Sequence, residues 1–293
     1  MFIIETKGLK IILEVVPVDS LRLHEAIIPG VANKLLLELK NWAHLQNPII
    51  CGTNHIVLDG HHRTYAFKKL NLPFIPVCKI DYHHENTQVR CWFRLFTNVE
   101  DLTLILQLFK NSGGIILPVE SKDRLKQELG NAPLSFGIQQ GGRYFIVRFP
   151  PHIVKDAVTA YDHLERLQYL LAQKGIETNY IPNEAPENEQ FCTTLDRNQA
   201  VIWTPQITKE MVEEVVENNR RFAPKTTRHI IPARPLHVNV PISWFKKQIS
   251  LEAINKKFAH FLSKKGIRRL PPGQVINGRY YEEELFVFFD KKS

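Results

Sequence analysis

The residues best suited to chemistry lie in one short run, Val57-Leu-Asp-Gly-His-His-Arg-Thr64. We expect an apolar strand to end at Asp59, Gly60 to permit a tight turn with positive φ, and a helix to begin within two or three residues. The first amides of a helix lack partners within it and, with the helix dipole, form an anion site. The run therefore predicts a phosphate-binding turn. The alternative is an ordinary junction of strand, glycine and helix, because Asp-Gly is also a common turn.

The side chains that follow the glycine suit the same anion. Arg63 offers a guanidinium that matches phosphate oxygens, His61 and His62 add ring donors, and Thr64 adds a hydroxyl. Asp59, at the edge of the turn, is a candidate for holding a metal or orienting a nucleophile. Two adjacent histidines without further ligands are a poor zinc motif, so no direct metal site at the imidazoles is expected.

Hydrophobic periodicity around the turn predicts a compact α/β unit, with a break at Pro29-Gly30 before its first helix. A good helix and a strand follow in the middle of the chain, and Thr208 is a candidate cap for a later amphipathic helix. Trp42, Trp203 and Trp244 fit apolar faces and are assigned to the core. In chain order, the expected elements are strand 9–18, helix 31–45, strands 48–51 and 55–58, helix 64–70, strand 73–80, strand 143–149, helix 154–174, helix 205–219, and strands 238–240 and 285–289.

The order of these elements indicates an α/β (α+β) fold with two domains. We expect the first domain to span residues 1–98. The second, an α/β lobe at residues 99–293, is expected to complete the substrate site, with a cleft between the two.

Composition limits the class of protein. The chain has 293 residues, 44% hydrophobic and 23% charged, as is usual for a globular protein. Its net charge of +8 suits anionic partners, although no block of five or six like charges occurs. The four cysteines include no C-x-x-C pair, which favours a reducing compartment. No apolar run approaches a membrane span and no signal-peptide pattern begins the chain, so we expect a cytoplasmic protein without a membrane partner.

Two motifs resemble a known family. The pattern of apolar strand, D-G-H-H-R, helix and L-x-x-x-x-I-P-V resembles the ParB/sulfiredoxin superfamily, and the D-G-H-H-R form is similar to its free-serine kinases. Upstream, Val16-Pro-Val-Asp-Ser-Leu-Arg-Leu-His-Glu25 is similar to the kinases' V-P-V-D-x-x-x-L-H-E. The resemblance covers residues 10–95 well and 205–247 moderately. It implies a ParB/sulfiredoxin-like nucleotide-binding core in the first domain.

The resemblance also implies residue roles. Glu25 corresponds to the proposed base that activates the serine hydroxyl, and Asp59 to a second essential carboxylate. Pro224-Lys-Thr-Thr-Arg-His229 resembles a P-x-x-x-T-R-[FH] motif that would hold the serine carboxylate or phosphates. On residue type alone, Glu25 can be an exposed carboxylate and Trp92 a core residue. Arg228 and His229 can belong to a solvated loop. The implied substrate site comprises Trp92, Thr227, Arg228 and His229.

The activity implied is that of a small-molecule kinase. It would transfer a phosphoryl group from ATP or ADP to the hydroxyl of free L-serine, or of a similar small compound, giving O-phospho-L-serine. Mg²⁺ is the expected cofactor, held mainly by phosphates with Asp59 as the candidate protein ligand, because two carboxylates beside a polyphosphate repel it unless a cation intervenes. Arg228 is the candidate cation for the acceptor's carboxylate.

Three other functions are compatible with parts of the sequence. A ParB-like regulator that binds nucleotide and DNA without kinase activity is the main alternative, and the basic charge favours it. However, no helix-turn-helix with a dense basic recognition helix is evident, so nucleic acid is not the expected partner. A sulfiredoxin-like reductase needs a cysteine in the turn, which this turn lacks. A regulator that binds nucleotide or haem without catalysis stays open.

Overall fold

The computed structural model describes residues 1–6, 8–183 and 195–291. The chain folds into two compact units, one formed by residues 1–88 with 229–293 and the other by residues 89–228. Residues 229–293 therefore return to the first unit, whereas the sequence suggested a continuous second domain from residue 99. The return has a physical basis, because helix α7 (Leu251–Ser263) packs on strand β2 (Leu9–Pro17). The Asn255 side chain bonds the Val15 backbone across this contact.

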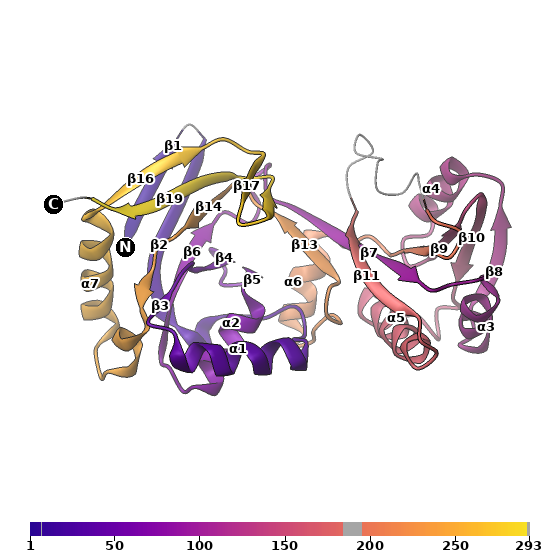
Figure 1. Ribbon diagram of the computed structural model, residues 1–293, viewed down its shortest axis with the longest axis horizontal. Coiled ribbons are helices and arrows are strands. Elements are labelled where there is room, and N and C mark those ends of the chain that lie inside the picture. Colours follow the sequence, from indigo (N-terminus) through magenta and orange to yellow (C-terminus); the bar gives the residue numbers. More distant parts are fainter. Residues whose placement is uncertain (7, 184–194, 292–293) are drawn as a thin grey trace. The chain divides into compact units, whose positions relative to one another are not determined.

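The first unit is built on a five-stranded sheet of order β1-β2-β6-β4-β5, in which β4 and β6 are parallel (Figure 1). A second, three-stranded sheet has the order β14-β19-β16. Besides β2 and α7, the elements of this unit are β1 (Phe2–Thr6), η1 (Val18–Ser20), α1 (Pro29–Asn41), β3 (His44–Leu45), β4 (Ile49–Gly52), β5 (Val57–Asp59), α2 (His61–Lys69), β6 (Phe74–Ile80), β14 (Ala233–Leu236), β15 (Val240–Pro241), η3 (Ile242–Lys246), β16 (Lys265–Leu270), β17 (Gln274–Ile276), β18 (Arg279–Tyr281) and β19 (Glu284–Asp290).

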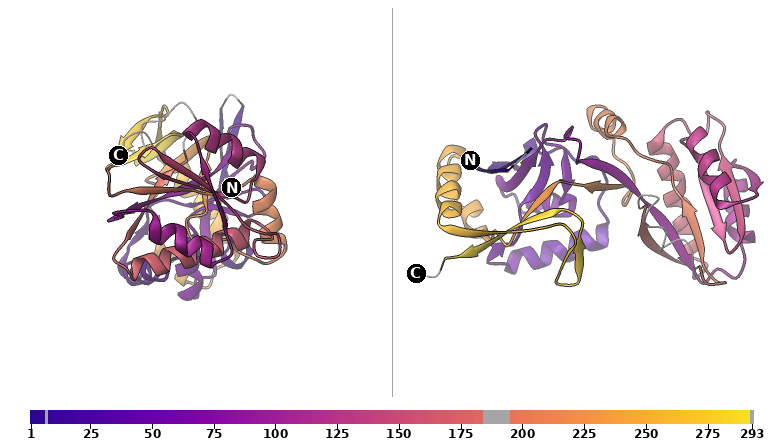
Figure 2. Two further views of the ribbon diagram at one scale, coloured as in Figure 1. Left: turned by 90° about the vertical axis from the view of Figure 1, so that its right-hand side faces the viewer. Right: turned by 90° about the horizontal axis from the view of Figure 1, so that it is seen from above.

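The second unit is built on a sheet of order β11-β7-β12-β9-β10-β8, with β13 beside β7. Helices α3, α4 and α5 pack against its strands (Figure 2). One core cluster of the sheet comprises Cys91, Phe93, Leu125, Ile146, Val201 and Trp203. The elements are β7 (Gln88–Thr97), α3 (Thr103–Asn111), β8 (Ile115–Val119), α4 (Lys122–Asn131), β9 (Phe136–Gln140), β10 (Arg143–Arg148), α5 (Ala157–Ala172), β11 (Glu177–Pro182), β12 (Ala200–Trp203), α6 (Lys209–Glu217) and β13 (Thr227–Ile230).

Local sequence explains where several helices begin. Thr208 caps α6 by accepting a hydrogen bond from the Met211 amide at 3.2 Å, as predicted. Asp156 and Thr159 form a reciprocal capping box at the start of α5. The expected break at Pro29-Gly30 is wrong: Pro29 lies in the first turn of α1, where its missing N–H costs nothing.

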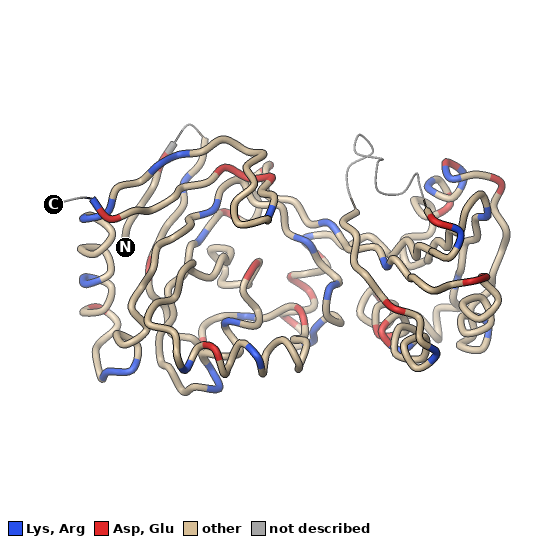
Figure 3. The backbone as a smooth tube through the Cα atoms, viewed as in Figure 1, with Lys and Arg blue, Asp and Glu red and all other residues tan. Residues whose placement is uncertain are grey.

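The mixed α/β class is confirmed. Lys and Arg are interspersed with Asp and Glu along the described backbone of each unit (Figure 3). Trp203 is buried as predicted, but Trp42 is 37% exposed, because α1 ends at Asn41 instead of continuing to residue 45. Within the described ranges, no helix has both the length and the apolar character needed to cross a bilayer.

Candidate active site

The turn after β5 has the predicted conformation. Gly60 is the N-cap of α2 with φ 110°, and a Cβ there would lie 2.7 Å from Cδ1 of Ile49. Both facts require glycine, since L-residues rarely adopt this φ and the space is already filled. A glycine cap offers no side chain to the first amides of α2. The N-terminus of α2 therefore offers main-chain N–H donors and the positive end of a helix dipole, which together favour an anion.

Asp59 lies between two guanidinium groups. Its Oδ2 accepts a hydrogen bond from Nη1 of Arg234, and Nη2 of Arg63 lies 3.6 Å from the same oxygen. Burial alone would raise the pKa of the Asp59 carboxyl, but the charges of Arg234 and Arg63 hold it well below its ordinary range. Asp59 is therefore ionised at neutral pH and is too weak a base to accept a proton there.

Arg63 and Thr64 have structural contacts that the sequence did not suggest. Nη1 of Arg63 donates to the carbonyl oxygens of Asn47 (2.7 Å) and Pro48 (3.1 Å), which ties α2 to the chain before β4. Thr64 is fully buried in α2, and its hydroxyl has no hydrogen-bond partner among the described residues. The predicted phosphate contact of Thr64 stays a prediction. Phosphate binding by Arg63 stays a prediction.

Glu25 lies in a segment that is fastened to the turn on both sides. Before it, the Arg22 amide donates to the His55 carbonyl at 3.0 Å, next to β5. After it, the Ile28 amide donates to Nε2 of His62 at 3.0 Å. Since a backbone N–H can only donate, this nitrogen of His62 is the acceptor and the ring is neutral. Glu25 is half-buried, and the residues around it hold its segment against the start of α2.

Three histidines and a tyrosine gather behind the turn. Nε2 of His61 lies 3.2 Å from Nδ1 of the completely buried His24, and the two rings meet edge to face with centroids 4.5 Å apart. His229 packs on the same ring at 5.1 Å, and its Nε2 lies 3.3 Å from the Tyr82 hydroxyl. Burial, followed by the charges of His61 and His229, lowers the pKa of His24 well below its usual value, so this ring is neutral.

The predicted substrate residues divide between the two units. Within the second unit, Nε1 of Trp92 donates to the Thr227 carbonyl at 3.1 Å, and the Arg228 guanidinium lies 5.6 Å from the Trp92 ring centroid. Lys225, which the sequence did not single out, lies 5.2 Å from the same ring. Three of the four residues thus cluster, with Thr227 contributing its main chain. His229 belongs to the first unit.

The sequence also missed residues that shape the site. His24 had one signal, its place in the L-H-E motif beside Glu25. Arg234 and Glu283 had none, because ordinary Arg and Glu residues far from the turn carry no local pattern. Among the described residues, no three or more His, Cys, Asp or Glu side chains form a group that could hold a metal ion.

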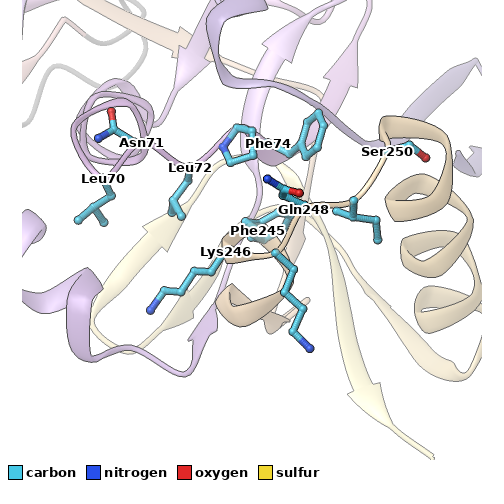
Figure 4. Close-up of a pocket in the computed structure, with 11 residues that line it drawn as sticks. Leu70, Asn71, Leu72, Phe74, Phe245, Lys246, Gln248 and Ser250 are labelled. Atoms are coloured by element: carbon cyan, nitrogen blue, oxygen red, sulfur yellow. The ribbon is translucent and has the colours of Figure 1, made fainter.

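A separate pocket of about 710 Å³ lies at the other end of α2 (Figure 4). Its lining comes from residues 70–74, just after the helix, and from residues 245–250. The nine residues of α2 span about 13 Å, so this pocket and the Gly60 turn lie at opposite helix ends. The C-terminal end of a helix carries partial negative charge, which does not favour a phosphate. We therefore do not assign this pocket to a nucleotide.

The chain is similar to known proteins over most of its length. The chain is 25% identical over 239 residues to an ATP-dependent L-serine kinase of Staphylothermus marinus, covering 79% of this chain and 90% of the relative. It is 28% identical over 222 residues to a ParB-like protein of Sulfolobus acidocaldarius, covering 74% and 90%. The chain is therefore similar over most of its length both to L-serine kinases and to a ParB-like protein.

A solved structure carries the same fold. A free serine kinase in complex with AMP aligns with a TM-score of 0.63 at 18% identity, covering 80% of this chain and 93% of the other. This likeness shows that the two chains share a fold, and it agrees with the α/β class expected from the sequence. No family model matches the chain.

Proposed function

We propose that this protein is a kinase that transfers a phosphoryl group from ATP or ADP to the hydroxyl of free L-serine, giving O-phospho-L-serine. One observation carries the proposal: the segment that contains Glu25 is hydrogen-bonded to β5 and to His62, next to the glycine-capped start of α2. The chain segment that carries Glu25 is thereby held beside an anion-binding helix end. The relatives named as serine kinases support the choice of acceptor.

The reaction assigns different work to the two carboxylates. The serine oxygen attacks the terminal phosphorus, the bond from that phosphorus to the nucleotide's bridging oxygen breaks, and the serine proton passes to Glu25. Asp59 does not compete for this proton, because Arg234 and Arg63 keep its pKa low. Its carboxylate instead gives the site a fixed negative charge. The main-chain amides after Gly60 hold the donor phosphates, with His61 lining the same turn.

Mg²⁺ is part of the proposal. The described residues offer no cage of three or more ligands, so the fit is to an ion that takes most of its ligands from phosphate oxygens and water, with Asp59 as the protein carboxylate. Such an ion would neutralise charge on the transferred group. The predicted roles of Trp92, Thr227, Arg228 and His229 in binding serine stay predictions, as does a cytoplasmic location.

The test is direct. Purified protein is incubated with Mg²⁺, L-serine and either ATP or ADP, and O-phosphoserine is measured by mass and by ³¹P NMR. Glu25→Gln should lower kcat by about 10²–10⁴-fold, the usual range for loss of a general base. Glu5→Gln is the matched control, since Glu5 is an exposed residue of β1 in the same unit.

Other outcomes would redirect the assignment. Transfer to a different hydroxyl compound, with none to serine, would keep the kinase and discard the acceptor. Duplex DNA binding at physiological salt without transfer to any acceptor would favour the ParB-like regulator, to which the 28% identical relative also points.

A further inference from the structure

A buried guanidinium joins two carboxylates in the first unit. The side chain of Arg234, on β14, is 8% exposed. Its Nη1 donates to Oδ2 of Asp59, and its Nε donates to Oε1 of Glu283 at 2.5 Å. The side chains of Glu283 and Asp59 are 10% and 36% exposed. The Glu283 carboxylate is thus enclosed, whereas the Asp59 side chain is partly exposed.

The charges explain why two carboxylates are present. A buried guanidinium is costly unless it is paired and hydrogen-bonded, and removing one partner leaves an uncompensated charge. The charges of Arg234, Arg63 and Arg279 all act on Asp59. Without Glu283, the charge of Asp59 would have to compensate these arginines with no second carboxylate on Arg234. With Glu283 present, Arg234 is held by its own partner and serves as a fixed donor to Asp59.

The geometry also determines which oxygen of Asp59 faces a ligand. Both arginines approach Oδ2. Neither of these two contacts involves Oδ1, and the Asp59 side chain is 36% exposed, so we infer that Oδ1 is the oxygen offered to an incoming group. Arg234 gives one N–H to Asp59 and another to Glu283, and Arg63 approaches the same Asp59 oxygen, so charged contacts from two arginines favour one rotation of the Asp59 carboxylate.

The C-terminal segment provides this rigidity. β14 and β19 pair in parallel, so that Arg234 lies beside Leu285 and the Glu284 amide donates to the Pro232 carbonyl at 3.3 Å. Leu285 packs in an apolar cluster with Leu236 and Tyr281. Glu283 is therefore placed by a packed strand pair, and the contact from Arg234 to Asp59 spans 175 residues of sequence.

We propose that Arg234, held by Glu283, is a positioning residue that fixes the orientation of the Asp59 carboxylate for phosphoryl transfer. This inference rests on the proposed function. The chain after residue 229 would then help to orient a carboxylate of the active site. Neither Arg234 nor Glu283 needs to touch substrate for this role. A purely structural ion pair is the competing explanation, and enzyme kinetics measured beside stability separate the two.

The experiment measures kcat and KM for serine phosphorylation together with thermal unfolding. Arg234→Lys keeps the positive charge but replaces the guanidinium, whose two nitrogens contact Asp59 and Glu283, with a single ammonium. The lysine should therefore contact one of the two carboxylates. We expect kcat to fall about 10–100-fold, the range for residues that orient a functional group, while both KM values change less than about 3-fold. Glu283→Gln keeps a hydrogen-bond acceptor and removes the negative charge. Its kcat should lie between that of the wild type and that of Arg234→Lys. The control is Arg269→Lys, in an exposed pair with Glu284 on the neighbouring strand.

A double-mutant cycle shows whether Arg234 acts through Asp59. If it does, Asp59→Asn with Arg234→Lys should lose no more than about twice what Asp59→Asn alone loses, because the second change has nothing left to orient. Multiplicative losses would overturn the inference, as would an unchanged kcat in a folded Arg234→Lys protein. If Arg234→Lys does not fold, Glu283→Gln decides the question by the same criteria. No transfer by the wild-type protein would overturn the proposed function itself, and the inference with it.

Discussion

Nε2 of His61 lies 3.2 Å from Nδ1 of His24, and His24 is completely enclosed. The hydrogen bond of His24 with the Val57 backbone raises its pKa, which is the effect of a ring N–H that donates to a carbonyl oxygen. Nδ1 of His24 and Nε2 of His61 share one hydrogen bond, in which one ring donates and the other accepts. The buried ring thereby orients a histidine of the phosphate-binding turn, as a partner of an imidazole does in many sites.

The first prediction follows from the burial of His24. Its pKa lies below the ordinary value of about 6.5 in the folded protein, mainly because burial disfavours the charged ring and the charges of His61 and His229 add to this. Below about pH 6.5 the unfolded chain takes up a proton that the folded protein does not. The free energy of unfolding is therefore highest above this pH. It falls as the pH decreases below about 6.5, by up to about 1.4 kcal/mol per pH unit.

Urea unfolding at pH 7, 6 and 5 measures this dependence. His24→Gln should be less stable at pH 7 but should flatten the pH dependence between pH 7 and 5. His260→Gln, at an exposed position on α7, is the control and should leave the slope unchanged. An identical slope in wild type and His24→Gln would show that another group causes it.

The second prediction concerns Gly60. Gly60→Ala combines a φ of 110° with a Cβ 2.7 Å from Cδ1 of Ile49, so it should lower the free energy of unfolding by about 1–3 kcal/mol. It should also weaken ADP binding at least 10-fold in calorimetry, since the amides after the turn would shift. Gly30→Ala is the matched control: Gly30 lies in α1, and a Cβ added there would have no heavy atom within 4 Å. Wild-type affinity in a folded Gly60→Ala protein would remove the turn from the nucleotide site.

Local parts of the site were predictable and distant parts were not. Gly60, the helix after it and the Thr208 cap follow from neighbouring residues, because backbone conformation and capping depend on residues a few positions apart. Arg234 reaches Asp59 across 175 residues, and no periodicity within either segment encodes that contact. The return of residues 229–293 to the first unit was missed for the same reason. The prediction for Trp42 shows a smaller error, because the apolar periodicity predicted a helix to residue 45, whereas α1 ends at Asn41.

The third prediction concerns the three described cysteines, Cys51, Cys78 and Cys91, which are all buried. Burial raises the pKa of Cys51 to about 12 and also raises that of Cys78 and Cys91 above the usual value. Since the thiolate is the reactive form, iodoacetamide at pH 8 should modify these positions slowly in the native protein and rapidly in urea. Peptide mass spectrometry resolves each site. Rapid native modification of Cys51 would contradict its burial in β4.

The fourth prediction tests how the C-terminal segment is held. The side chain of Asn255 accepts from the Val15 amide at 2.9 Å and donates to the Val15 carbonyl at 2.8 Å, thereby acting as a strand partner beyond Leu13, where the pairing of β1 with β2 ends. Asn255→Ala leaves both backbone groups of Val15 without this partner, and an unsatisfied buried group costs about 1–3 kcal/mol. We expect a loss of this size in urea unfolding.

The neighbouring residue provides the control for Asn255. Lys256 is exposed and forms a surface ion pair with Glu252 one turn away, so Lys256→Ala should change stability by less than about 0.5 kcal/mol. Because α7 lies between β14 and β16 in sequence, a loosened α7 should also loosen the strands that place Arg234 and Glu283. Hydrogen exchange in Asn255→Ala should therefore quicken in β14 and β19 as well as in α7. Faster exchange confined to α7 would show that the strand pair is held independently of the helix.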